Sequence, residues 1–184
     1  MLETSGKRGR MGQGRGDGHD GYPEFAAARA GHLFRSACLL TGGDTHLAED
    51  LVQETLGRVY VRWGRISRVG NPAGYAQTVL TRTFLAHRRR HSSSRERATE
   101  VLPEVPGPDA GGDAPLRLTL LDALGRLSAK DRAVVVLRYW EDRSIEETAA
   151  AMNTSSAAVR TRCVRALARL RLLLGDALGE YARP

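Results

Sequence analysis

The stretch from Ser144 to Arg171 reads SIEETAAAMNTSSAAVRTRCVRALARLR, and it decides the fold of the chain around it. Ser144, followed three residues later by Glu147, forms a capping box, which predicts the start of a helix. Asn153 is expected to end this helix, because asparagine tolerates the left-handed backbone conformation better than most residues. Ser155 can then cap a second helix. Two capped helices joined by so short a turn predict a helix-turn-helix.

The second helix of this pair has two distinct faces. Its apolar stripe, at spacings of three and four residues, consists of Val159, Cys163, Ala166, Leu167 and Leu170. At about 100° per residue, the opposite face carries Ala157, Thr161, Val164 and Arg165, with Arg160 beside them. Small residues allow close approach, and arginines suit phosphates and base edges, as in a recognition helix in the major groove. We therefore predict DNA contacts by Arg160, Thr161, Arg162, Val164 and Arg165. The alternative is a helical hairpin with a solvated basic face.

The composition limits the classes of function. The formal net charge of +7 favours a polyanionic partner, although a GC-rich genome also produces the observed excess of arginine over lysine. Cys38 and Cys163 have no CxxC motif or histidine cluster near them. We therefore expect buried thiols in a reducing compartment, with neither a metal site nor a cofactor. No apolar run approaches the roughly 18 residues of a membrane span, which favours a soluble, cytoplasmic protein without membrane insertion.

The rest of the sequence predicts an all-α chain of two small helical domains joined by a flexible linker. Residues 1–21 are rich in Gly, Arg and Asp and have almost no large apolar residue, which predicts a disordered tail. Helical periodicity defines a first domain over 22–92 and a second over 116–180, which contains the helix-turn-helix. Residues 93–115 are rich in Pro and Gly and are interpreted as the linker.

One helix of the first domain has an acidic face. In the predicted helix over 48–60, the apolar residues face inward, and the opposite face carries Glu49, Asp50, Gln53 and Glu54. An acidic cluster in a basic protein would repel DNA and suits a basic protein partner. A solvated helix face is the alternative explanation for this pattern.

A second candidate DNA surface follows the acidic helix. Trp63 precedes a polar loop over 64–70, and Asn71 with Pro72 then predicts a helix start. An aromatic residue beside a basic loop and a basic helix is an arrangement that holds single-stranded nucleic acid, although Trp63 taken alone is more often a core residue. The residues that we expect to contact DNA here are Trp63, Arg65, Arg68, Asn71, Arg82, Arg88 and Arg89.

Together these parts resemble a bacterial RNA polymerase sigma factor of the extracytoplasmic-function (ECF) group, the small type with only regions 2 and 4. In the first half the resemblance rests on AEDLVQE at 48–54, VYVRW at 59–63 and NPAGY at 71–75. In the second half it rests on LSAKDRAV at 127–134, on LRYWED at 137–142 and on the helix-turn-helix. The match covers about residues 22 to 175, and we expect an actinobacterial member.

The resemblance implies a subunit that directs the RNA polymerase core to specific promoters and assists promoter opening. In the family, the helix matching 48–56 docks on the polymerase clamp, so the implied polymerase contacts are Asp50, Gln53 and Glu54. The region matching 65–90 captures the unpaired strand of the minus-ten element. The second domain sits on the polymerase flap and reads the minus-thirty-five element through Arg160, Thr161, Val164 and Arg165. An anti-sigma factor is a further candidate partner.

Two positions depart from the family pattern. Arg82 stands where many relatives carry an asparagine that helps to form the pocket for a flipped base. Asn153 stands where the turn of the helix-turn-helix usually has glycine, at a strain cost of about 1 kcal/mol. Arg82 therefore affects how the minus-ten element is recognised, whereas Asn153 affects only the turn of the helix-turn-helix.

Two other functions compete with this one. A stand-alone helix-turn-helix regulator that binds an operator would explain residues 116–175, but it leaves the acidic face and the Trp63 loop without a role. A DNA-processing enzyme would need a carboxylate cluster with metal spacing, a nucleophile beside a base, or a phosphate-binding glycine loop. The sequence has no such motif, so we expect no enzymatic activity.

Overall fold

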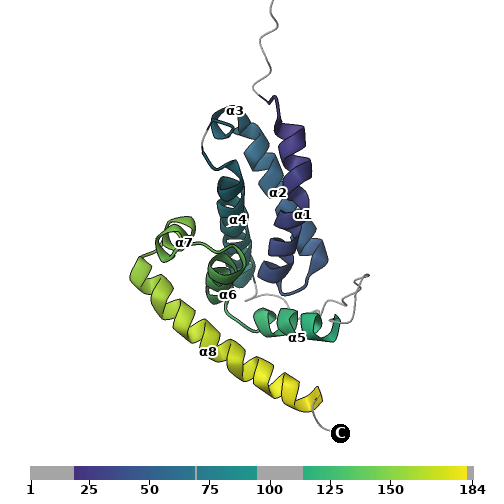
Figure 1. The fold of residues 1–184 in the computed structure, drawn as a ribbon, viewed down its shortest axis with the longest axis vertical. Coiled ribbons are helices and arrows are strands. Elements are labelled where there is room, and N and C mark those ends of the chain that lie inside the picture. The colour runs from purple at the N-terminus through teal and green to yellow at the C-terminus, as the bar shows by residue number, and fades with distance from the viewer. Residues whose placement is uncertain (1–18, 69, 95–113, 182–184) are drawn as a thin grey trace, which may run out of the picture.

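The computed structural model describes residues 19–68, 70–94 and 114–181. Every regular element in these ranges is helical (Figure 1), which confirms the predicted all-α fold class. Residues 1–18 and 95–113, which hold most of the expected tail and linker, lie outside the described residues.

The N-terminal half is built from α1 (Tyr22–Thr41), α2 (Thr45–Val61), the short α3 (Trp63–Ile66) and α4 (Pro72–Ser94). In Figure 1, α1 and α2 lie side by side and α4 packs beside α2. Their apolar faces meet in one core, in which the largest fully buried side chains are Leu40, Leu51, Leu80 and Phe84. Burial of these faces holds the half together, since each large apolar side chain contributes about 1.5–3 kcal/mol.

Three helix ends of this half are defined by their backbone conformation or by capping hydrogen bonds, and the predicted helix start at Asn71 is confirmed. Helix α1 ends at Gly42, whose φ of 73° lies in the left-handed region. Asp44 begins α2 by accepting a hydrogen bond at 2.9 Å from the backbone N–H of Leu47. Asn71 begins α4 in the same way, with its side-chain oxygen 2.7 Å from the backbone nitrogen of Gly74. These caps satisfy N–H groups that have no partner within the helix.

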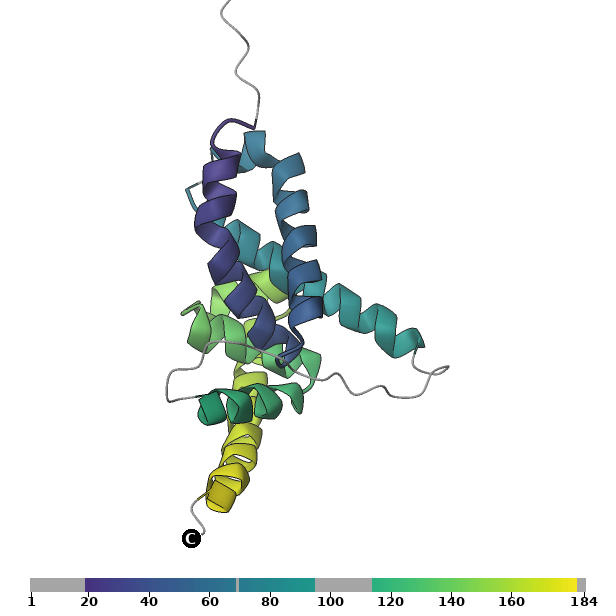
Figure 2. The same cartoon turned by 90° about the vertical axis from the view of Figure 1, so that its right-hand side faces the viewer.

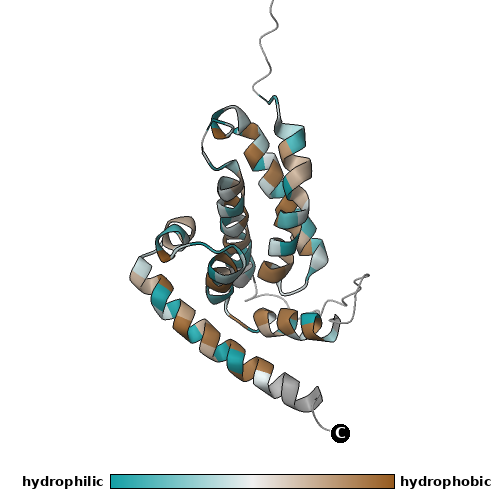
Figure 3. Cartoon of the chain, viewed as in Figure 1, coloured by the Kyte–Doolittle hydropathy of each residue, from teal (hydrophilic) through white to brown (hydrophobic). Residues whose placement is uncertain are grey.

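The C-terminal half consists of α5 (Ala114–Gly125), α6 (Ala129–Val135), a π-helical turn η1 (Val136–Trp140), α7 (Ile145–Met152) and α8 (Ser156–Tyr181). Helix α8 forms the lower left edge of Figure 1, and hydrophobic and hydrophilic bands alternate along it in Figure 3. Its buried residues Val159, Ala166 and Leu170 belong to the predicted apolar stripe. They pack towards α5, α6 and α7.

The predicted helix-turn-helix is confirmed in α7 and α8. The Ser144 hydroxyl accepts a hydrogen bond from the Glu147 N–H at 3.0 Å, and the Glu147 carboxylate accepts one from the Ser144 N–H at 2.8 Å. Asn153 ends α7 at φ 51° and ψ 56°, in the left-handed region. Ser155 then caps α8 by accepting from the Ala158 N–H at 3.1 Å. Each local sequence signal therefore produced the expected backbone feature.

Replacing Ser144 with alanine is expected to destabilise the chain by about 1 kcal/mol, because it removes one side of the capping box. Denaturant-induced unfolding of the full chain measures this change, with the exposed Ser67→Ala as a control that should stay within about 0.5 kcal/mol of the parent. The hydrogen bonds from Ser144 lower the pKa of Glu147. Its stabilising effect is therefore present above the unfolded pKa of about 4.3, and the difference between parent and variant should shrink as the pH falls below that value.

The π-helical turn η1 changes which residues face the core. The N–H of Glu141 bonds to the carbonyl of Val136 at 3.0 Å, five residues back, so the turn is wider than an α-helical turn. The apolar residues of 129–140 predict an inward-facing set of Val134, Leu137 and Tyr139. Val134 and Leu137 are buried, but Tyr139 is 55% exposed, so this part of the prediction is wrong. An extra residue in the turn shifts the phase of every side chain that follows it.

The two halves pack directly against each other. Helices α1 and α4 contact α6, η1 and α7, and Figure 2 shows the C-terminal end of α4 extending away from these contacts. The contact between the two halves, here called the seam, includes a close approach of two backbones. A Cβ added to Gly42 would lie 2.8 Å from the Cα of Gly125, so this approach is possible only because Gly42 lacks a side chain.

A buried arginine stabilises this contact between the two halves. Arg132 of α6 is 3% exposed, and its guanidinium donates to the carbonyl oxygens of Leu40 at 2.9 Å, Gly125 at 2.6 Å and Leu127 at 3.2 Å. Burial lowers the pKa of Arg132 to about 10. The group stays charged at neutral pH and joins the end of α1 to the turn between α5 and α6.

Candidate nucleic-acid interfaces

The outward face of α8 is exposed along the predicted reading residues. Its predicted reading residues Arg160, Thr161, Val164 and Arg165 are all exposed, as is Ala157 one turn earlier. Val164 is 71% exposed, which is unusual for an apolar side chain in the middle of a long helix. Arg160 lies 3.5 Å from Glu146 of α7, and this ion pair is weak because both side chains are well exposed.

Arg162 differs from the other predicted residues of α8. Its guanidinium lies 2.8 Å from a carboxylate oxygen of Asp131, and both side chains are less than one-third exposed. The other carboxylate oxygen of Asp131 accepts a hydrogen bond from Ser128, the N-cap of α6. Arg162 therefore ties the reading helix to α6, and its predicted contact with DNA remains a prediction.

The acidic face of α2 lies beside a shallow groove. Glu49, Asp50 and Gln53 are exposed, and Glu54 is half-buried with Arg58 at 2.6 Å. The groove has a volume of about 350 Å³, and its lining includes Gly31, Phe34, Val52 and Gln53. A groove with apolar walls and acidic residues at its border suits a protein partner that offers both apolar and basic side chains.

Trp63 lies in the core of this structure. It is 5% exposed, its ring contacts Tyr22 and Phe25, and its indole N–H donates to the Asp20 carbonyl at 2.8 Å. Its burial favours a structural role, while the predicted contact with DNA remains untested. The exposed side chains next to it are Tyr60 and Val61, although the sequence pattern placed Tyr60 inward.

The polar residues around α3 lie at the surface, but the predicted loop is partly helical. Arg65 falls within α3, and Arg68 and Asn71 follow it; all three are exposed. The burial of Ile66 explains the extra turn of helix, because one turn carries this side chain into the core. Asn71 also lines a cleft of about 450 Å³ between the halves, together with His32, Gln77, Glu141 and Arg143.

Arg82 of α4 reaches the other half of the chain. Its guanidinium donates to the backbone carbonyls of Ala151 at 2.8 Å and Ala150 at 2.9 Å, in the last turn of α7. A cation at the C-terminal end of a helix meets carbonyl groups that have no partner within the helix. In this structure Arg82, which was predicted to contact the minus-ten element, therefore bonds to the end of α7.

A basic cleft follows Arg82 along α4. It has a volume of about 800 Å³, and the cations that line it are Arg82, Arg88, Arg89 and Lys130. Burial is the main cause that lowers the pKa of His87, and the neighbouring His91, Arg90 and Arg88 lower it further. Sequence reasoning missed Lys130, because only the packing of α6 near α4 brings it there.

The described parts of the chain contain no group of three or more His, Cys, Asp or Glu side chains that could hold a metal ion. Cys38 is buried, Cys163 is half-buried, and neither is in a disulfide. Within the same residues, no helix combines the length and the apolar character needed to cross a bilayer.

Two family models match this chain, one to each half. Sigma-70 region 2 matches residues 28–94, and sigma-70 region 4 matches residues 117–170. The RNA polymerase sigma-E factor of Streptomyces coelicolor is 41% identical over 150 residues, which cover 82% of this chain and 84% of that protein. The ECF RNA polymerase sigma factor SigL of Mycobacterium tuberculosis is 34% identical over 159 residues, covering 84% of this chain and 87% of that protein.

Solved structures show the same fold. The sigma factor RpoE of Bartonella quintana, in complex with the anti-sigma factor NepR, superposes with a TM-score of 0.67 at 24% identity and covers 84% of this chain and 96% of that chain. CnrH, in complex with the cytosolic domain of CnrY, superposes with a TM-score of 0.56 at 21% identity, covering 84% of this chain and 88% of that chain.

The two family matches and these relatives define the class of protein, a bacterial transcription initiation factor. The chain belongs to the ECF RNA polymerase sigma factors, and it directs RNA polymerase to specific promoters. The family resemblance drawn from the sequence is confirmed, and the Streptomyces and Mycobacterium relatives support the expected actinobacterial membership.

Proposed function

We propose that the exposed face of α8 reads the upstream promoter element in the major groove. The observation that supports this role is the continuous exposure of Ala157, Arg160, Thr161, Val164 and Arg165 on one side of a capped helix. The side chain of Val164 suits apolar contact with a thymine methyl group, and Arg165 suits the acceptor atoms of guanine. Arg162 supports this face from behind through its ion pair with Asp131.

The acidic face of α2 is the surface that we assign to the polymerase clamp. Asp50 and Gln53 are exposed there, Glu54 is half-buried beside them, and Gln53 also lines the groove between α1 and α2. The sign of its charge excludes a direct contact with DNA phosphates. The flap of the polymerase is the expected contact of the C-terminal half.

The unpaired strand of the downstream element is assigned to the basic surface of the N-terminal half. The residues that we propose to contact this strand are Arg65, Arg68, Asn71, Arg82, Arg88 and Arg89. Free energy from these contacts and from the upstream duplex would offset the cost of opening the promoter, while the polymerase supplies the chemistry. The chain itself is then a non-enzymatic factor of the cytoplasm, and an anti-sigma factor is a candidate partner.

Transcription from a randomised promoter library tests this function. Purified core polymerase is assayed with and without the chain, and the transcripts are sequenced. Transcripts that require the chain and share two upstream elements would support the proposal. If no such transcripts appear and no complex with core polymerase forms in gel filtration, an operator-binding regulator becomes the better explanation.

Replacing Asp50 with arginine is expected to weaken binding to core polymerase by roughly tenfold, since it places a like charge against a basic partner surface. Fluorescence anisotropy with labelled chain measures the affinity. The control is Glu24→Arg, which makes the same charge change at an exposed position in the first turn of α1. Binding of upstream duplex DNA should be equal in both variants, and an Asp50→Arg chain with undiminished polymerase affinity would contradict the assignment.

A further inference from the structure

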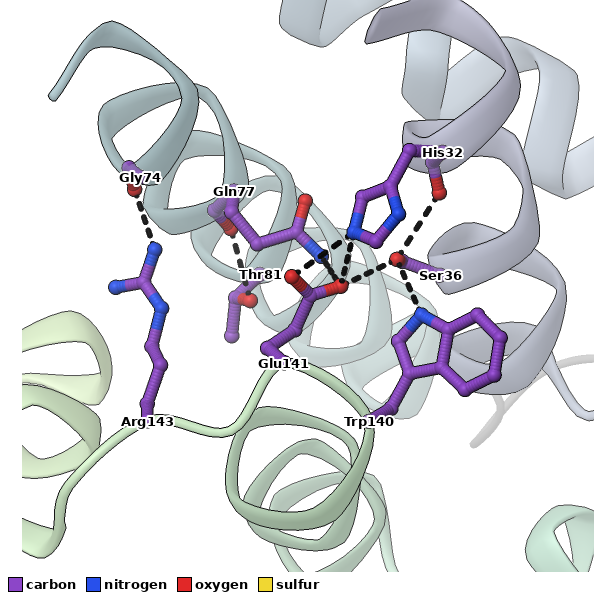
Figure 4. A network of polar contacts seen from close by, with 8 residues as sticks. All are labelled: His32, Ser36, Gly74, Gln77, Thr81, Trp140, Glu141 and Arg143. Atoms are coloured by element: carbon purple, nitrogen blue, oxygen red, sulfur yellow. Dashed lines mark hydrogen bonds and ion pairs between the residues drawn. The ribbon is translucent and has the colours of Figure 1, made fainter.

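At one place in the seam the chain brings its own anion to a group of donors. Glu141 follows η1, and its side chain is only 10% exposed. Figure 4 shows it pointing between α1 and α4, where Nε2 of His32 lies 3.0 Å from both carboxylate oxygens. The Ser36 hydroxyl donates to it at 2.6 Å, and the Gln77 amide donates as well. The Trp140 indole N–H donates to Ser36 at 3.0 Å. A carboxylate that leaves water needs such donors, and here one chain supplies both sides.

Further along α4, cations from both halves gather around one cleft instead. This is the basic cleft of about 800 Å³ where α4 faces α6 and the end of α7 (Figure 1), lined by Arg82, Arg88, Arg89 and Lys130. No Asp or Glu of the described residues lines it. Within the same ranges neither Arg88 nor Lys130 takes part in an ion pair. The anion that Glu141 supplies elsewhere in the seam has no counterpart in the lining of this cleft.

The nearby charges do not compensate these cations. Asp131 follows Lys130 in sequence, but its carboxylate lies 2.8 Å from Arg162 and accepts a hydrogen bond from Ser128. Burial is the main cause that lowers the pKa of Arg132, and Arg88 lowers it further. A cation that lowers the pKa of another cation repels it. An anion bound in the cleft would offset this repulsion.

Arg82 is held in place at the border of the cleft. It is exposed, and its Nε and Nη2 donate to the carbonyls of Ala151 and Ala150 at 2.8 and 2.9 Å. The remaining N–H groups of the guanidinium can still bind an anion. Guanidinium groups suit phosphate oxygens, and one that is already positioned loses less conformational freedom on binding. The charge pattern therefore favours a ligand with several phosphate groups.

The rest of the lining is apolar and suits a flat ring. Leu85 of α4, Ala129 of α6 and Met152 of α7 are half-buried along the cleft. Its volume lies within the range of about 300–1,000 Å³ for small-molecule sites, which combine apolar walls with a few polar groups. Methionine adapts its shape to a ring, and the exposed Asn153 offers an amide donor and acceptor at the border. These features match a heterocyclic base.

We propose that this cleft binds a nucleoside polyphosphate, with the phosphate chain on Arg88, Arg89 and Lys130 and the base against Leu85 and Met152. The cations come from both halves, so the complete site requires the seam. Arg82, Arg88 and Arg89 are also assigned to the unpaired promoter strand, so nucleotide and strand would compete. Only this competition rests on the proposed function; binding of the nucleotide to the chain does not.

Isothermal titration calorimetry of the full chain at low salt, without polymerase or DNA, tests the site. ATP is the probe, and AMP and tripolyphosphate are the comparisons. AMP keeps the base but has a single phosphate, whereas tripolyphosphate keeps the phosphates but has no base. We expect one ATP to bind per chain, and both comparison ligands to bind at least about tenfold more weakly, because each lacks one part of what the cleft recognises.

Two variants remove one cation from each half. Lys130→Met and Arg88→Met should each weaken ATP binding by about tenfold, since each removes a charge-assisted contact with phosphate. Arg126→Met is the matched control, because it removes an exposed cation that pairs with Asp122 and does not line the cleft. Its ATP affinity should stay within about twofold of the parent. This control is needed because a chain with a net charge of +7 attracts any polyanion. Circular dichroism confirms the helical content of each variant.

Three results would each overturn the proposal. The first is no heat of binding with ATP at millimolar concentration. The second is an equal loss of affinity in Lys130→Met, Arg88→Met and Arg126→Met, which would indicate general attraction to a basic surface. The third is tripolyphosphate binding as tightly as ATP, which would leave no role for the base. All three are measured on the chain alone, so the sigma-factor function is decided separately, by transcription from the promoter library with core polymerase.

Discussion

Replacing Arg165 with alanine is expected to reduce discrimination between matched and mismatched upstream elements by about 5- to 150-fold, corresponding to about 1–3 kcal/mol for one good base contact. Arg165 is exposed on the same face as Thr161, one turn further along α8. Among the described residues, no ion pair or hydrogen bond ties its side chain to the rest of the protein. Loss of the guanidinium should therefore change DNA recognition without changing the fold.

Run-off transcription from promoters with single substitutions in the upstream element measures this effect. Arg169→Ala is the matched control, because it removes the same charge from an exposed position one turn beyond Arg165. If residue 169 faces phosphate, its loss should weaken binding to all sequences equally and reduce the salt dependence. An Arg165→Ala chain with the full selectivity of the parent would show that the reading face is wrong.

Replacing Arg132 with methionine is expected to destabilise the chain by about 2–4 kcal/mol. Methionine matches the length of the arginine stem but leaves three buried carbonyls, of Leu40, Gly125 and Leu127, without their donor. Hydrogen bonds to a charged group are worth about 1.5–3 kcal/mol each, and they do not add fully when one group makes several. The loss should be larger than for any surface cation.

Urea unfolding of the full chain, followed by circular dichroism, measures this loss. Lys130→Met is the control, since it lies on α6 two residues away and is exposed, so its effect should stay within about 0.5 kcal/mol. Equal midpoints for the two variants would mean that the three carbonyls find other partners, and that the seam does not depend on Arg132.

The helix ends and the reading face could be predicted from sequence because their causes are local. Ser144 and Glu147 are three residues apart, and the cap they form needs no other part of the chain. The face of α8 follows from helical periodicity, so Thr161 and Val164 were placed correctly at the surface. Asn153 shows the same rule, since its left-handed conformation depends on its own side chain and the end of α7.

Features that depend on distant residues escaped prediction. Glu141 and His32 are 109 positions apart, and no local pattern couples them. Arg162 has the charge of a DNA contact, yet Asp131, which is 31 positions away, determines where it points. Tyr139 was misplaced for a different reason: at about 100° per residue it points to nearly the opposite side of the helix from Leu137, so its aromatic character alone supported burial. The π-helical turn itself could not be predicted, because the periodicity of one segment contains no information on the contacts between the halves.

The π-helical turn η1 constrains how this chain can be recombined with its relatives. It presents Trp140 and Glu141 to the N-terminal half with one residue more than an α-helical turn would need. A hybrid that takes the segment 136–141 from a protein with a regular helix would rotate both side chains by roughly a quarter turn about the axis. Exchange of whole halves therefore requires that this segment and its acceptors on α1 and α4 come from the same parent.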